Sequence, residues 1–137
     1  MDGHVKVTLL SRSRYEGGED ILTFAGNGLL KRTESGWHLR YPAASQDGSR
    51  MASDIRLEGV RAVVRNITGD YTITLDKKEE TSARIPTQMG TLTMTVATRQ
   101  LEWQLEEAPG HMTMDYTLMA MGQTLSDLHL TIYLTYQ

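Results

Sequence analysis

The chain of 137 residues contains no cysteine, three prolines and one phenylalanine. The absence of cysteine excludes disulfide scaffolds, catalysis by a thiol, and zinc or iron–sulfur sites with cysteine ligands. No run of about 18 apolar residues occurs, so the sequence predicts no membrane-spanning helix and no membrane partner. The net charge of -3 argues against a general nucleic-acid binder, and we expect no nucleic-acid partner.

The length predicts a single domain that covers residues 1–137. A chain of this size buries enough surface in one core to be stable without disulfides or a structural metal. Residues 1–14 alternate polar and apolar side chains, and they lack the continuous hydrophobic segment of a secretory signal. We therefore expect a cytoplasmic protein.

The composition and the periodicity favour β-strands. The sequence has 17 threonines and six tyrosines, residue types that suit half-buried strands. Apolar and polar residues alternate almost from end to end, most clearly over residues 5–9, 92–96, 112–120 and 128–136. No window has the 3.6-residue repeat of an amphipathic helix. The sequence predicts an all-β protein, an antiparallel up-and-down barrel of about 8–10 strands, because closure removes exposed sheet edges.

Two irregularities interrupt this alternation. The glycines of Gly26-Asn27-Gly28 are expected to end a strand in a turn. Further on, the apolar positions change from even to odd between residues 96 and 101 without an intervening proline or glycine. Such a change predicts a β-bulge near residues 97–100, a device that bends sheets at barrel corners.

The parity of the apolar positions also predicts the register of two hairpins. Partners across the turn at residues 108–111 should have numbers with an odd sum, which places Trp103 opposite Tyr116. Partners in the C-terminal hairpin should have an even sum, which excludes a two-residue loop and favours a three-residue loop over residues 122–124. Met112 is then expected opposite Leu134.

No motif in the sequence carries recognisable chemistry. The segment Gly26-Asn27-Gly28 lacks the third glycine and the following helix of a phosphate-binding loop. The usual contexts of a nucleophilic serine are missing, and the four histidines show no metal-binding spacing. We therefore predict no catalytic residues, no metal ligands and no cofactor. Three of the eight methionines, Met94, Met112 and Met114, lie on apolar strand positions, where they either line an adaptable cavity or fill the core.

The second half of the chain contains a set of spaced residues: Glu58-Gly59, Arg65, Thr87-x-x-Gly90 before a Leu-x-Met strand, and Gly110 with Tyr116 six residues further on. In these residues and their spacing the chain resembles the YwiB-like family of small uncharacterised bacterial proteins. The resemblance covers residues 58–137, and more loosely the region of Gly28, Trp37 and Tyr41. It implies a calycin-like, lipocalin-like barrel whose interior can hold one small apolar or amphipathic molecule.

The leading functional hypothesis is a non-enzymatic protein that binds a small apolar or amphipathic ligand in the barrel interior. The ligand-binding residues expected are Arg65, Tyr41, Trp103, Met114 and Tyr116. A second hypothesis is a structural or protein-interaction module whose barrel is filled by its own side chains. A third is an enzyme with a site built from Arg65, Tyr41, Tyr116 and a carboxylate. The oligomeric state stays open, and a homodimer is one option.

Arg65 is the proposed polar anchor. It lies two residues from Val63 on the same expected strand, so both side chains should lie on the same face, and we expect this face to point inward. An inward guanidinium would need an acidic partner or a ligand, because an unpaired buried charge is costly. The alternative role for Arg65 is a salt bridge that closes one end of the barrel.

Overall fold

A computed structural model describes residues 2–136, which form ten β-strands and no helix. The strands are β1 (Gly3–Tyr15), β2 (Gly18–Arg32), β3 (Gly36–Ser45), β4 (Arg50–Glu58), β5 (Arg61–Asn66), β6 (Tyr71–Asp76), β7 (Thr81–Thr87), β8 (Gly90–Gln104), β9 (Gly110–Ala120) and β10 (Gln123–Tyr136). Residues 2–136 accordingly contain no helix that is long and apolar enough to cross a membrane.

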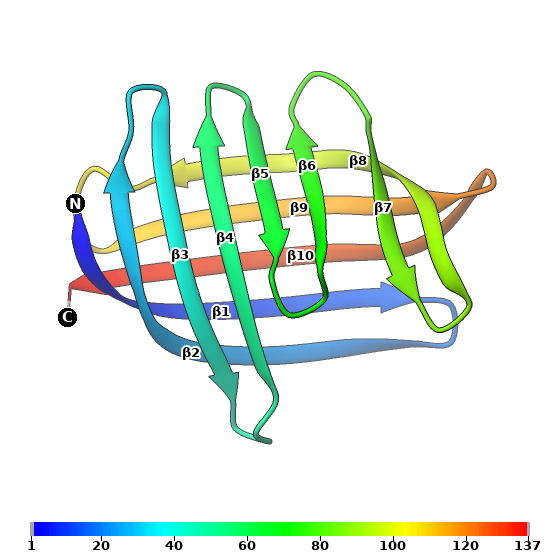
Figure 1. Ribbon diagram of the computed structural model, residues 1–137, viewed down its shortest axis with the longest axis horizontal. Helices are drawn as coiled ribbons and strands as arrows, with labels where there is room; N and C mark the ends of the chain where they lie inside the picture. The colour runs from blue at the N-terminus through cyan, green and yellow to red at the C-terminus, as the bar shows by residue number, and fades with distance from the viewer. Residues whose placement is uncertain (1, 137) are drawn as a thin grey trace.

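The ten strands form one antiparallel sheet that curls into a nearly closed barrel, as Figure 1 shows. Sequence neighbours pair throughout except at one place, and β1 pairs with β10, so the sheet order is β6-β5-β4-β3-β2-β1-β10-β9-β8-β7. The all-β, up-and-down barrel predicted from the alternation is confirmed. The two sheet edges, β6 and β7, meet at a seam where the Thr81 hydroxyl donates a hydrogen bond to the Thr74 carbonyl oxygen.

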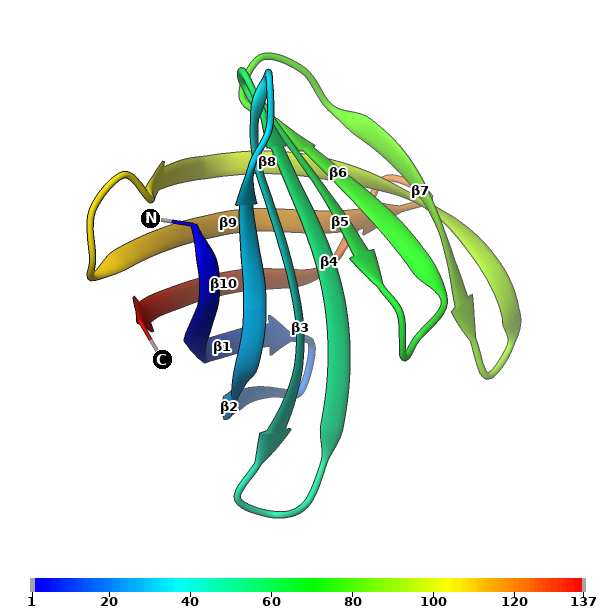
Figure 2. The ribbon, with the colours of Figure 1, turned by 60° about the vertical axis from the view of Figure 1, so that its left-hand side comes forward.

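The barrel has two layers whose strands cross at a steep angle. Strands β8, β9, β10 and β1 form one layer, and β3 to β7 form the other, while β2 curves between them (Figure 1 and Figure 2). The expectation that Gly26-Asn27-Gly28 ends a strand is wrong, because β2 runs through this segment. A Cβ atom on Gly26 would lie 2.0 Å from the Pro42 carbonyl oxygen. The glycine therefore allows β2 and β3 to approach closely.

The bulge expected in β8 is present. The β8–β9 register shifts between Thr98 and Gln100, so the prediction of a bulge near residues 97–100 is confirmed. Beyond it, partners have an odd sum as predicted, but Trp103 faces Met112 and not Tyr116. The connection comprises residues 105–109 and is therefore centred closer to β8 than a loop at Pro109-Gly110, and its first residue, Leu105, is buried in the core.

The β9–β10 hairpin combines a tight turn with a second bulge. Its two-residue turn is Met121-Gly122, with φ angles of 52° and 75°, so the exclusion of a two-residue loop is wrong. The register shifts again between Thr124 and Ser126, which restores the predicted even sum. As a result, Met112 faces Ile132 and not Leu134.

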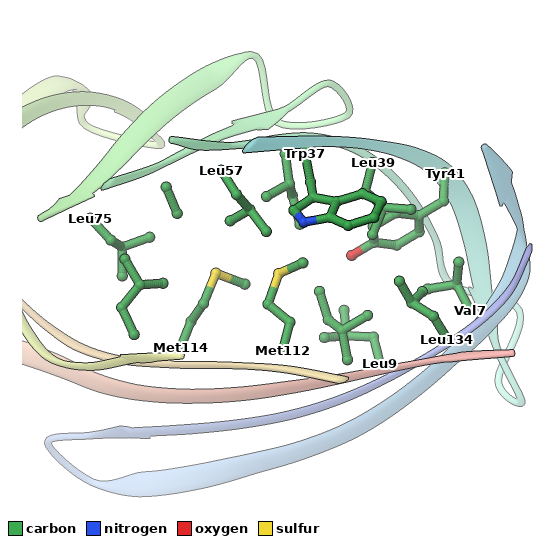
Figure 3. Packing of buried hydrophobic residues seen from close by; sticks show 14 of the residues in the cluster. Val7, Leu9, Trp37, Leu39, Tyr41, Leu57, Leu75, Met112, Met114 and Leu134 are labelled. Carbon is green, nitrogen blue, oxygen red and sulfur yellow. The ribbon is translucent and has the colours of Figure 1, made fainter. Parts of the chain in front are cut away.

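Apolar side chains fill the end of the barrel near the start of β3 and the end of β4. A cross-strand row of four buried side chains lies here. It runs from Trp37 on β3 through Leu57 on β4 and Ala62 on β5 to Leu75 on β6. Met112 packs beneath them from the other layer, as Figure 3 shows. This half of the barrel is therefore a packed core.

Candidate functional site

The other half of the barrel interior contains a cavity of about 250 Å³. Its lining comes from both layers, with β9, β10, β1 and β2 on one side and β3 to β6 on the other. Tyr41 and Ile55 close the deep part of the cavity and are buried, whereas Met51, Asn66 and Tyr71 are partly exposed. The cavity therefore lies between the packed core and the turns that follow β3 and β5.

Four polar side chains form a continuous row across one wall of the cavity. Tyr41 on β3 is the direct partner of Ser53 on β4, Ser53 is the partner of Asn66 on β5, and Asn66 is the partner of Tyr71 on β6. Direct partners in an antiparallel sheet point to the same face, so all four side chains face the cavity. We call Tyr41, Ser53, Asn66 and Tyr71 the polar row.

Hydrogen bonds hold the polar row in place. Asn66 Nδ2 donates to the Tyr71 hydroxyl oxygen at 3.1 Å, and Asn66 Oδ1 accepts from the Gly69 backbone N–H at 2.7 Å. The Ser53 hydroxyl donates to the Arg65 carbonyl oxygen at 3.4 Å. The turn between β5 and β6 thus fixes the Asn66 amide, which in turn positions the Tyr71 hydroxyl.

The cavity lining is electrically neutral. Burial raises the pKa of the Tyr41 phenol to about 12, and a hydrogen bond with Ser53 opposes this only in part. Burial also raises the pKa of Tyr116, with a smaller contribution from Tyr71. Both phenols are therefore protonated at neutral pH. Among residues 2–136, no Asp, Glu, Lys, Arg or His side chain lines the cavity.

The wall opposite the polar row is almost entirely apolar. Met114 and Leu130 are direct cross-strand partners on β9 and β10, and Leu9 pairs with Ile132 in the same way. All four line the cavity. The Met114 thioether is flexible and polarisable, so this wall can adapt its shape to a guest. The arrangement offers a molecule one apolar side and one side of neutral hydrogen-bonding groups.

Three of the five ligand-binding residues expected from the sequence line this cavity: Tyr41, Met114 and Tyr116. Trp103 lies elsewhere. It is partly buried against the core, and the Lys77 ammonium nitrogen lies 5.5 Å from the centre of its ring. Trp103 therefore packs against the filled half of the barrel and does not line the cavity.

The inward orientation expected for Arg65 is wrong. Its side chain is half exposed on the outer face of β5, where its Nη2 atom lies 2.8 Å from Asp70 Oδ1. Ala62 and Val64 pair with buried residues of β4, so the even positions of β5 face the interior and the odd positions face outward. The structure consequently does not bring Arg65 together with Tyr41 and Tyr116, as the hypothesis of an enzyme site requires.

The sequence analysis missed Ser53, Asn66 and Tyr71. Each has a signal in the sequence, because it occupies the same strand parity as buried apolar neighbours such as Ile55 and Ile73. A polar residue on the apolar side of a strand indicates an interior polar group that needs a partner.

Charged side chains on the outer face form ion pairs with one another. Arg99, at the β8 bulge, pairs with Asp115 on β9 and at 2.5 Å with Asp127 on β10, and so ties three strands together. His38 Nε2 lies 2.8 Å from Asp54 Oδ1 across β3 and β4. Within residues 2–136, no group of three or more His, Asp or Glu side chains is arranged to hold a metal ion.

Comparison with known proteins identifies a family and a fold. Residues 7–132 match the family model described as Domain of unknown function (DUF1934). The crystal structure of ywiB protein from Bacillus subtilis is similar to the chain, with a TM-score of 0.74 and 14% identity over 96% of this chain and 92% of that chain. No curated protein sequence matches the chain significantly. The family resemblance noted in the sequence is confirmed, and the structural similarity shows the same fold.

Proposed function

The chain belongs to the DUF1934 family, and we propose that it is a non-enzymatic binding protein that holds one small apolar or amphipathic molecule inside a calycin-like barrel. The observation that carries this proposal is the cavity of about 250 Å³ between the polar row and the apolar wall. The cytoplasmic location expected from the sequence is part of the proposal.

The two unlike walls of the cavity support an occupant. The cavity opens to solvent beside the partly exposed side chains of Met51, Asn66 and Tyr71, so it is expected to hold water or a ligand. Water satisfies the polar row but gains little from the apolar wall, so an amphipathic molecule should replace it favourably.

The volume limits the size of the ligand. A water molecule takes about 30 Å³ in the liquid, and on that scale the cavity accommodates on the order of ten non-hydrogen atoms. Pockets that hold drug-sized ligands are larger, with volumes of about 300–1,000 Å³. The proposal is accordingly limited to small molecules with a short apolar part.

Native mass spectrometry of the protein purified from its producing cells tests the proposal. We expect a complex whose excess mass corresponds to a small molecule and disappears on denaturation. Protein that carries no small molecule should then bind 1-octanol, measured by isothermal titration calorimetry. Protein that is ligand-free from cells and binds none of a set of eight-carbon amphiphiles would overturn the proposal.

The second candidate function is a structural or protein-interaction module. It is favoured by the packed half of the barrel, where Trp37, Leu57 and Met112 leave the interior filled by the protein's own side chains. Under this alternative the cavity holds water only. The same titrations separate the two functions, because a module of this kind should show no saturable uptake of amphiphiles.

A further inference from the structure

We infer that the ligand of the cavity is a neutral amphiphile, with hydroxyl, carbonyl or amide groups along one side, and not a carboxylate, phosphate or ammonium compound. This inference rests on the proposed function and specifies its ligand class. It is based on the juxtaposition of an uncharged polar row with an apolar wall inside one cavity.

The lining has no group that could compensate a ligand charge. Transfer of an ion from water into a protein interior costs several kcal/mol unless an opposite charge and further hydrogen bonds compensate it. Among residues 2–136 the cavity lining contains no Asp, Glu, Lys, Arg or His side chain, and burial raises the pKa of the Tyr41 and Tyr116 phenols. A charged ligand would therefore lose its hydration without gaining an ion pair.

Arg65 illustrates this selectivity. It stands between Val64 and Asn66, two residues that line the cavity, and an inward side chain at this position would supply the cation that a carboxylate ligand needs. The side chain instead points outward and pairs with Asp70. The strand parity of β5 thus places the positive charge on the opposite face of the sheet from the ligand.

The geometry of the polar row indicates more than one polar contact. Neighbouring strands lie about 4.8 Å apart, so the four strands of the row place hydrogen-bonding groups over roughly 14 Å. The Tyr71 hydroxyl accepts a hydrogen bond from Asn66 and can donate its own proton to a ligand oxygen. A molecule that lies along the row can therefore present oxygen or nitrogen atoms to adjacent members, while its apolar side faces Met114 and Leu130.

Three probes that differ only in their polar group test the ligand class: 1-octanol, octanoate and octylammonium. We expect calorimetry at pH 7 to give a dissociation constant for 1-octanol at least about tenfold below those of both ions, because the ions lose hydration without compensation. Equal or tighter binding of either ion overturns this inference but leaves the proposed function standing. Failure of all three probes to bind, together with the absence of a small molecule in protein purified from cells, overturns the proposed function itself.

Two conservative variants test the polar row. Tyr71→Phe removes the hydroxyl and keeps the ring, and the matched control is Tyr133→Phe on the exposed outer face of β10. We expect Tyr71→Phe to weaken 1-octanol binding about threefold to tenfold, as for the loss of one hydrogen bond, and Tyr133→Phe to leave it unchanged. Ser53→Ala provides a second test against Ser82→Ala, whose side chain is exposed on β7. Unchanged 1-octanol binding in both Tyr71→Phe and Ser53→Ala would overturn the role of the polar row.

Discussion

A phenylalanine in place of Val64 should fill the cavity and prevent ligand binding. Val64 lies on β5 and lines the cavity, and its side chain points between the polar row and the apolar wall. The preceding residue, Val63, lies on the opposite face of the same strand and is absent from the lining. The pair Val64→Phe and Val63→Phe therefore makes the same chemical change on the two faces of one strand.

The magnitude follows from the space available. The substitution adds four carbon atoms, and at about 0.8 kcal/mol per buried carbon they contribute at most about 3 kcal/mol to the free energy of unfolding. Overpacking in a site without room costs about 1–3 kcal/mol. With a cavity of about 250 Å³ to receive the ring, the gain should exceed the strain by about 1 kcal/mol. The melting temperature should then rise by about 4 °C.

Thermal unfolding followed by circular dichroism and titration with 1-octanol measure both effects. Val64→Phe should melt slightly above the wild type and bind 1-octanol at least about tenfold more weakly, because the added ring occupies the same volume. Val63→Phe should bind normally and melt within about 2 °C of the wild type. A Val64→Phe variant that melts more than about 4 °C lower and still binds 1-octanol would refute the reasoning, since it would show that the interior has no room at Val64 and that the ligand binds elsewhere.

Two further predictions concern the frame around the cavity. The Lys78 backbone N–H and the Arg61 guanidinium lower the pKa of Asp76, so this carboxylate contributes stability above its ordinary pKa and loses that contribution as the pH falls below about 4. In Asp76→Asn the melting temperature should accordingly fall less at acid pH than in the wild type. The same dependence of the melting temperature on pH in both proteins would contradict the assigned contacts. Gly26→Ala should lower the free energy of unfolding by about 1–3 kcal/mol, measured by denaturant titration, because the added Cβ would lie 2.0 Å from the Pro42 carbonyl oxygen. An unchanged midpoint would show that β2 and β3 do not approach so closely.

The sequence predicted the interior face well where the alternation is regular. In β9 the apolar residues Met112, Met114 and Tyr116 are buried, and Asp115 between them lies outside. The alternation is decisive here because, over residues 111–118, one side of the strand carries only apolar residues and the other only polar ones. The fold and the apolar wall of the cavity were predictable from this pattern.

Arg65 shows why the same reasoning failed in β5. This strand has three consecutive apolar residues, 62 to 64, so both parities contain an apolar residue and the alternation is weaker than in β9. The orientation follows from the pairing of Ala62 with the buried Leu57 on β4, a contact that depends on the register of two strands. Glycine presents a similar difficulty, because Gly26 looks like a local turn signal although its role is a close contact with Pro42.

The apolar wall on β10 depends on two irregularities that compensate each other. A two-residue turn with positive φ at both Met121 and Gly122 matches the twist of a hairpin, but it pairs residues whose numbers have an odd sum. Continued along β10, that register would turn Leu128 and Leu130 away from the interior, because a shift of one residue reverses every side chain. The extra residue Leu125 in the bulge corrects the register before these leucines are reached. Parity predicted which side chains form the wall, whereas the turn and the bulge that produce this parity become visible only when the pairing of both strands is known.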